Sequence, residues 1–207
     1  EDMLYIAFSS GLSGTCQSAL IAKQQLEEQF PGRRVEVFDS LAASMGEGLL
    51  VYLAAQQQKA GLTLDQLLAW LKENVLHLCH WFTVDDLNHL KRGGRVSAAT
   101  ALVGTMLGIK PVLHVDDEGH LIPVSKVRGR KQSLDELVRK MAETALDPAG
   151  QTVFISHGDC LADAQYVEKR VRETLGVKKF YINFIGPVIG AHSGPGTVAL
   201  FFLGQHR

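Results

Sequence analysis

The chain has 207 residues, of which 46% are hydrophobic, and its formal net charge is -1. That is enough apolar sequence for one large domain or two small ones, and the balanced charge excludes the basic surface that general nucleic-acid binding needs. Its three cysteines, Cys16, Cys79 and Cys160, form no CxxC pair. This excludes a disulfide scaffold and favours reduced thiols in a cytoplasmic protein.

The sequence opens almost directly on an apolar segment, Leu4 to Phe8, that is typical of a buried strand. Glu1 and Asp2 stand where a secretory signal would carry basic residues, so no leader is predicted, and we expect a segment upstream of the strand to be missing. The most apolar stretch, residues 96–115, is interrupted by glycines, a lysine and a proline. No integral membrane segment is therefore predicted.

The first part of the chain alternates between strand-like and helix-like patterns. Apolar residues at helical spacing follow a serine-rich loop and reach Phe30, a second short strand follows at residues 35–38, and a second helix is expected from Leu41 to Ala60. This strand-loop-helix-strand-helix order is typical of a parallel sheet. Residues 1–61 are predicted to be the remainder of an N-terminal parallel α/β domain.

From residue 62 the pattern is that of an α+β domain, predicted to span residues 62–207. Helices are expected at residues 63–75, 133–145 and 161–175, and strands at residues 77–84, 109–115, 120–127, 153–157, 178–185 and 197–203. Asp116, Asp117, Glu118 and Gly119 favour an antiparallel hairpin between the second and third of these strands.

The loop Ser9–Thr15 joins a buried strand to the start of a helix. Backbone N–H groups at a helix start lack partners within the helix and favour negative charge. The hydroxyls of Ser10, Ser13 and Thr15 surround these donors, and Gly11 lets a ligand approach the backbone. The loop therefore suggests an anion cradle, although a turn rich in helix caps explains the same residues. It contains neither a Walker lysine nor a GxSxG nucleophile motif.

A second glycine-rich motif, His192–Gly196, lies between apolar segments near the end of the chain. A tight turn there would bring the His192 ring close to a ligand, where it could donate a hydrogen bond to a carboxylate. A histidine that only stabilises a turn is the competing interpretation.

Other polar residues carry weaker signals. His77 and Cys79 share one face of a strand and His80 the other, so no metal site is predicted, and Cys16 and Cys160 are expected to be packing residues. The basic clusters at residues 91–95 and 126–131 are either solvated surface or a docking site for a partner with acidic or phosphate groups.

Together these motifs resemble the DegV family, a bacterial fatty-acid-binding family that includes the FakB carrier subunits of fatty acid kinase. The matching segments are Phe8–Thr15 with Gln17-Ser18-Ala19, Asp39-Ser40 with Gly46 and Gly48, Leu90–Ser97, Lys110-Pro111 and His192–Gly196. They follow the family order across essentially the whole chain.

The resemblance implies a DegV-like fold: a partial N-terminal parallel α/β domain and a C-terminal α+β domain with a six-stranded, mostly antiparallel sheet, with one long-chain fatty acid between them. Family members begin with a further segment that carries a carboxylate-binding threonine, and this sequence has no counterpart. By position, Ser10 and Gly11 are the first expected carboxylate ligands, Ser13 and Thr15 support them, and His192 closes the site. Residues expected to help line an acyl tunnel are Val103, Met106, Leu107, Ile109, Phe154 and Phe184.

The function implied is that of a cytoplasmic, non-catalytic carrier without cofactor or metal. It would present the fatty acid carboxylate to a separate ATP-dependent fatty acid kinase, feeding phospholipid synthesis, with Arg92, Arg128 and Arg130 docking the kinase subunit. The alternative is a hydrolase or acyltransferase acting on a lipid ester, in which Ser10 or Ser13 is the nucleophile and His192 the base.

Overall fold

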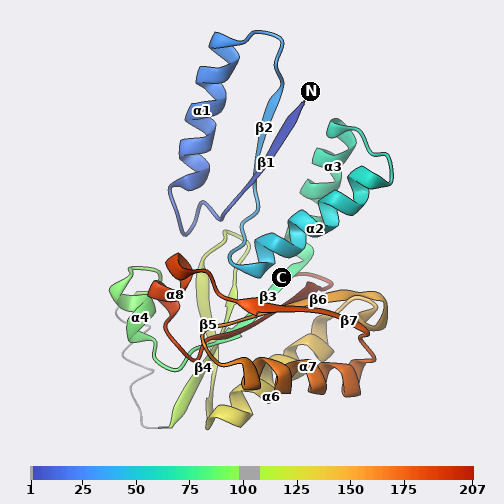
Figure 1. Ribbon diagram of the computed structural model, residues 1–207. Helices are drawn as coiled ribbons and strands as arrows, with labels where there is room; N and C mark the ends of the chain where they lie inside the picture. Colours follow the sequence, from blue (N-terminus) through green and yellow to red (C-terminus); the bar gives the residue numbers. More distant parts are fainter. Residues whose placement is uncertain (1, 98–107) are drawn as a thin grey trace.

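The computed structural model describes residues 2–97 and 108–207, which form a two-stranded sheet and a six-stranded sheet with helices around them (Figure 1). The two-stranded sheet pairs β1 (Met3–Ala7) with β2 (Val35–Asp39) in parallel. Helix α1 (Thr15–Gln29) connects them and packs against β2. The predicted parallel unit at the start of the chain is therefore confirmed.

The six-stranded sheet has the order β5-β4-β3-β8-β6-β7. Its strands are β3 (Leu78–Thr83), β4 (Ile109–Val115), β5 (Leu121–Arg128), β6 (Thr152–His157), β7 (Lys179–Phe184) and β8 (Val198–Leu203). All neighbours are antiparallel except β6 and β7, which are joined by the crossover helix α7 (Leu161–Leu175). The six-stranded, mostly antiparallel sheet is thus confirmed.

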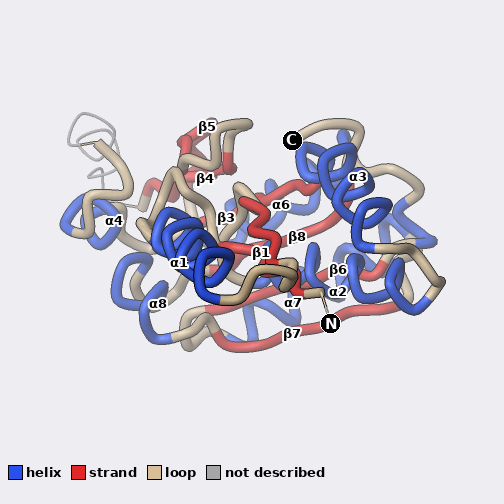
Figure 2. Tube along the Cα trace, turned by 90° about the horizontal axis from the view of Figure 1, so that it is seen from above, coloured by secondary structure: helices blue, strands red, loops and turns tan. Residues whose placement is uncertain are grey.

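Helices cover both faces of the large sheet (Figure 1). Helices α6 (Arg130–Thr144) and α7 pack on one face, and α2 (Met45–Lys59) with α3 (Leu64–Asn74) lies over the other. The core on the α2 side joins Leu49 and Leu50 of α2 to Phe82 and Phe201 of the sheet. Viewed from above, α4 (Asn88–Arg92) and α8 (Pro187–Ser193) lie to one side of α1, and α2 and α3 to the other (Figure 2).

Local sequence signals explain several element boundaries. Helix α3 begins with a capping box, in which Thr63 Oγ1 accepts a hydrogen bond from the Gln66 N–H and the Gln66 side chain accepts one from the Thr63 N–H. The predicted β4–β5 hairpin closes where Gly119, at φ +81°, donates from its N–H to the Asp116 carbonyl oxygen. Only glycine adopts this backbone conformation readily.

The clearest differences from the prediction concern three helices. Helix α2 begins at Met45 rather than Leu41, because Leu41 and Ser44 have positive φ angles that no α-helix contains. The short helices α4 (Asn88–Arg92) and α8 (Pro187–Ser193) were not predicted, since each spans few residues and is followed by glycine. His192 therefore ends a helix instead of lying within a turn. Two 3-10 turns, η1 (Val75–His77) and η2 (Pro148–Gly150), complete the described elements. Within those elements, none of the helices has the length and apolar character needed to cross a membrane.

Candidate functional site

A cavity of about 350 Å³ lies over the face of the six-stranded sheet that also carries α2. Its apolar lining comes from the sheet, the serine-rich loop, α4, α8 and the loops beside them: Phe8, Leu12, Ala43, Phe82, Leu90, Val115, Leu121, Ile185, Val188, Ile189, Ala199 and Phe201. This volume is within the usual range for pockets that bind small ligands. The cavity is therefore the candidate binding site.

The cavity lining also includes polar side chains from several segments. Ser13, Thr15, Arg95 and His192 all line the cavity. Arg95 Nε donates to the Leu12 carbonyl oxygen at 3.1 Å, and a second guanidinium nitrogen donates to the Gly93 carbonyl oxygen. Among the described lining residues, Arg95 is the only one with a fixed charge. The cavity thus combines long apolar walls with one cation.

The serine-rich loop satisfies most of its backbone donors itself. The N–H groups of Leu12 and Ser13 donate to the Ser9 carbonyl oxygen, and that of Gly11 donates to Ser9 Oγ at 3.2 Å. Ser9 Oγ, fully buried, donates in turn to the Gly119 carbonyl oxygen. These three N–H groups are already paired, and a backbone anion cradle in this loop remains a prediction. The hydroxyls of Ser13 and Thr15, hydrogen-bonded to each other at 2.7 Å, are the loop's polar groups at the cavity.

The two residues expected to bind the carboxylate first, Ser10 and Gly11, are not among the cavity-lining residues. Ser10 is exposed, and its N–H donates to Asp39 Oδ1 on the outer side of the loop. Gly11 packs against the β4–β5 hairpin so closely that a Cβ there would lie 2.8 Å from the Glu118 carbonyl oxygen. Sequence position alone did not indicate which side of the loop each residue faces.

Glycines hold α8 against α4. A Cβ at Gly93 would lie 2.0 Å from His192 Nδ1, and a Cβ at Gly194 would lie 2.6 Å from the His89 ring. Both separations are shorter than real Cβ contacts, so the two imidazole rings occupy the space that these glycines leave free. This packing fixes the His192 ring at the cavity wall.

The three arginines expected to dock a partner differ in their surroundings. Arg92 and Arg128 are exposed, and an Arg92 guanidinium nitrogen lies 3.1 Å from His89 Nδ1. Arg130 is bound within the protein: it pairs with Asp163 at 2.7 Å and lies 3.7 Å from Asp85. Its side chain is only 23% exposed. Arg130, the first residue of α6, therefore links this helix to α7 and to the loop after β3.

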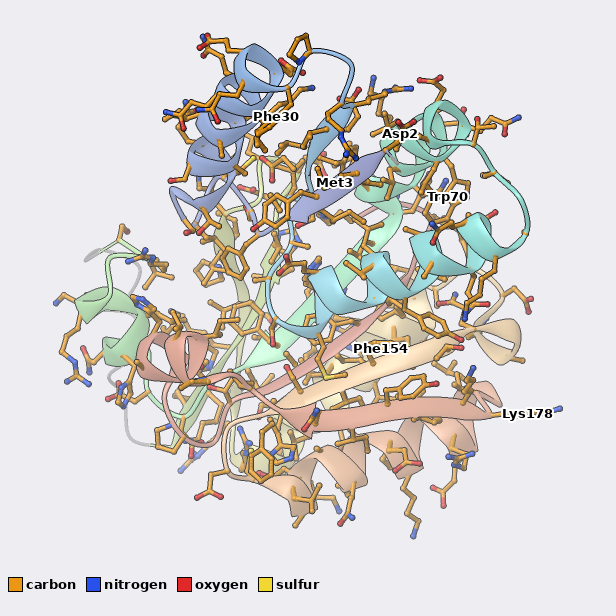
Figure 3. The ribbon with its side chains drawn as sticks, turned by 45° about the horizontal axis from the view of Figure 1, so that its top comes forward. Asp2, Met3, Phe30, Trp70, Phe154 and Lys178 are labelled. Atoms are coloured by element: carbon orange, nitrogen blue, oxygen red, sulfur yellow. The ribbon has the colours of Figure 1, made fainter. Side chains whose placement is uncertain are left out.

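The expected tunnel residues do not match the observed lining. Val103, Met106 and Leu107 lie outside the described residues, and Ile109, Phe154 and Phe184 are not among those that line the cavity. Phe154 lies between β6 and α2, where its ring contacts those of Tyr52 and Tyr181 (Figure 3). Which residues line an acyl tunnel stays a prediction: Phe154 lies on the same face of β6 as the lining residue Ser156, at a point where Tyr52 of α2 covers it.

Sequence reasoning missed several polar residues at the cavity. Arg95 was assigned only to a basic cluster, and His80 only to packing. Ser44 and Ser156 gave no motif at all, because they reach the cavity from separate elements that only the folded chain brings together, and Ser193 was noted only as part of the glycine-rich motif. Ser193 Oγ is buried and has no hydrogen-bond partner.

The histidine and cysteine residues in β3 and just before it lie in different surroundings. His77 Nδ1 lies 3.0 Å from the Gly204 carbonyl oxygen, while Cys79 faces the core on the α6 side. Burial raises the pKa of the Cys79 thiol to about 12. Over residues 2–97 and 108–207, no three His, Cys, Asp or Glu side chains are grouped as metal ligands would be.

Comparison with known proteins gives consistent matches along the chain. Residues 1–205 match the family model described as "Uncharacterised protein, DegV family". A DegV domain-containing protein of Clostridium perfringens is 48% identical over 205 residues, which cover 99% of this chain and 70% of the relative. A DegV family protein from Thermus thermophilus, whose structure is described with fatty acid binding, is 33% identical, with a TM-score of 0.84 over 98% of this chain and 70% of that chain.

The fold also matches a more distant structure. The fatty acid kinase B3 protein of Streptococcus pneumoniae, loaded with linoleic acid, has a TM-score of 0.87 and is 22% identical, covering 99% of this chain and 71% of that one. At this identity the likeness concerns the fold.

Proposed function

Because the chain belongs to the DegV family, we propose that it binds a long-chain fatty acid in the cavity, with the carboxylate beside Ser13, Thr15, Arg95 and His192. The observation that carries this proposal is one fixed cation, Arg95, among the described residues of an otherwise largely apolar lining. An anionic head on an apolar tail is the ligand class that complements such a surface.

The polar groups at Arg95 suit a carboxylate. A buried carboxylate needs several donors, and hydroxyl groups supply them without adding further charge. One of the Ser13 and Thr15 hydroxyls donates to the other, so the pair keeps one O–H that can donate to a carboxylate. The unpaired Ser193 hydroxyl beside His192 offers another donor. Ser10 and Gly11 would contribute by fixing the conformation of the loop, because the Ser10 N–H is bonded to Asp39 and Gly11 packs against the β4–β5 hairpin.

The carrier would present its carboxylate to a separate ATP-dependent kinase in the bacterial cytoplasm, which would form an acyl phosphate for phospholipid synthesis. This role follows from the family resemblance, and the chain itself would be non-catalytic and without a cofactor. Arg92 and Arg128 remain exposed for docking. Arg130 would support the same surface from within, through Asp85 and Asp163.

The competing hydrolase hypothesis needs a serine hydroxyl hydrogen-bonded to a histidine. Ser10 faces away from the cavity, and Ser13 Oγ bonds Thr15 Oγ1. Between these serines and His192 there is no hydrogen bond in the described part of the chain. No observation therefore favours this alternative over the carrier.

The deciding experiment is mass spectrometry of lipid extracted from the purified chain, with native mass spectrometry of the intact species. A stoichiometric fatty acid is expected, either as purified or after incubation with octadecanoic acid. Absence of binding in both samples would contradict the proposal. Labelling of Ser13 by a serine-reactive phosphonate would favour the hydrolase.

A further inference from the structure

The cavity ends along one row of side chains on the large sheet. Residues that pair across β6, β8 and β3 point to the same face of the sheet and so form rows across it. All three members of one row line the cavity: Ser156, Ala199 and Phe82. The next row consists of Phe154, Phe201 and His80. Of these, Phe201 and His80 line the cavity and Phe154 does not. Among the described residues, the cavity therefore stops at this second row, beside Phe154.

Helix α2 closes the cavity at the second row. A Cβ at Gly46 would lie 2.9 Å from Phe201 Cδ1, so the first turn of α2 lies directly on that ring. A Cβ at Gly48 would lie 4.0 Å from Phe154 Cε2, an ordinary van der Waals contact. The Phe154 ring is only 7% exposed. It fills the space between β6 and α2 just beyond the last residues that line the cavity.

An aromatic cluster holds the Phe154 ring in place from the outside. Its centroid lies 5.6 Å from that of Tyr52 on α2 and 5.0 Å from that of Tyr181 on β7 (Figure 3). Lys179 Nζ donates to the Tyr52 hydroxyl at 2.7 Å and lies 5.2 and 5.6 Å from the two tyrosine ring centroids. Aromatic pairs and cation–π contacts each stabilise such an arrangement. The ring is thus a fixed wall, because turning it aside would break these contacts.

We propose that Phe154 limits the length of the acyl chain that the cavity accepts, with the methyl end of the fatty acid directed toward α2. This inference rests on the proposed fatty acid binding and adds the residue that sets chain length. The proposed carboxylate site at Arg95 and His192 belongs to the segments of α4 and α8, which lie across α1 from α2 (Figure 2). A chain whose head is held there extends along the sheet toward Phe154.

The test is a series of saturated acids, from dodecanoic to docosanoic acid, that displace a fluorescent fatty acid from the full chain. Each added methylene should tighten binding about fourfold, the effect of burying one CH₂ group, up to a limiting length beyond which affinity no longer rises. Phe154→Ala opens space behind the second row, so its limiting length should increase. The acid two methylenes beyond the original limit should then bind about tenfold more tightly to the variant than to the unaltered chain.

The matched control is Phe180→Ala. Phe180 precedes Tyr181 on β7 but packs on the other face of the sheet, against the core beneath α6 and α7. Its removal should leave the limiting length unchanged. An unchanged limiting length in a folded Phe154→Ala, or the same increase in both variants, would overturn the assignment of chain length to Phe154 while leaving fatty acid binding intact.

A second readout uses the unaltered chain and does not depend on a variant that folds. Hexadecanoic acid with a photoreactive diazirine at its methyl end should label α2, the loop before it, or β6, as located by mass spectrometry of peptides. Label confined to α4, α8 or the serine-rich loop would overturn the proposed direction of the chain. If none of the acids binds to the unaltered chain, the proposed function itself fails.

Discussion

Arg95 Nε donates a hydrogen bond to the Leu12 carbonyl oxygen at 3.1 Å, across 83 residues of sequence. The bond ties the serine-rich loop before α1 to the segment after α4. Because the same guanidinium also donates to the Gly93 carbonyl oxygen, it holds the loop beside the glycine on which His192 packs. One side chain thus sets the spacing of the polar groups at the cavity.

Replacing Arg95 with alanine should weaken fatty acid binding. The variant loses the cavity's only fixed charge among the described lining residues and releases Leu12, so we expect a loss of about 1.5–3 kcal/mol, typical of hydrogen bonds to charged groups. Isothermal titration with a long-chain fatty acid measures it. Arg33→Ala, at an exposed position between α1 and β2, is the control. An unchanged Kd in Arg95→Ala would contradict the assignment of the carboxylate to this end of the cavity.

Two glycines in α2 should respond oppositely to alanine. In Gly46→Ala the new Cβ would meet His80 Nε2 and, at 2.9 Å, Phe201 Cδ1, so overpacking should destabilise the fold by about 1–3 kcal/mol. In Gly48→Ala the nearest atom is 4.0 Å away, and the higher helix propensity of alanine should stabilise by up to about 1 kcal/mol. Urea unfolding distinguishes them. Equal urea midpoints for the two variants would show that the side chains of His80 and Phe201 shift to make room for the new Cβ.

Charge reversal should separate two of the arginines expected to dock a partner. Arg130→Glu places a carboxylate beside Asp85 and Asp163, and we expect it to lower the free energy of unfolding by about 1–3 kcal/mol, because the site is only partly exposed. Arg128→Glu, at an exposed site, should change unfolding by less than about 0.5 kcal/mol. Thermal unfolding at equal ionic strength tests this. Loss of kinase turnover in Arg130→Glu would then reflect the fold as well as the docking surface.

Acidification should destabilise the protein through His80. Burial lowers its pKa in the folded state, so the unfolded chain binds the proton first. Its contribution to stability is complete above the unfolded pKa of about 6.5 and is lost as pH falls toward the lower folded pKa. Between about pH 7.5 and 5.5 we expect a loss of about 1 kcal/mol from this group.

Other groups also titrate in that range. Burial lowers the pKa of His114, which adds to the loss, and raises that of Glu47, which opposes it. The measurement is therefore the difference between the pH profiles of urea unfolding for the unaltered chain and for His80→Phe. Parallel profiles would show that the pKa of His80 is the same in the folded and the unfolded chain.

Much of the fold could be predicted because its signals are local. The capping box at Thr63, the turn at Gly119 and the alternation of strand and helix patterns each depend on a few neighbouring residues. Helix α8 escaped prediction because Gly190 and Gly194 favour turns in isolation, whereas packing against α4 stabilises the helix.

The site was predicted less completely than the fold. Ser13, Thr15 and His192 do line one cavity, as the motifs suggested. The sequence did not show that Ser10 turns outward to Asp39, or that Arg95 turns inward to Leu12. These orientations depend on contacts between distant segments, which spacing along the chain does not record.

The two-stranded sheet has a consequence for the order in which parts of the protein unfold locally. β1 and β2 pair over five residues each and have no third strand among the described residues, and such pairs are only marginally stable by themselves. Their amides should exchange with solvent through local opening, well before those of β3 and β8 in the large sheet. A ligand that contacts both Thr15 and His192 would bind only the closed arrangement, so loading would slow this exchange. The bound ligand would then stabilise the two-stranded sheet, so that this sheet and the large sheet unfold together.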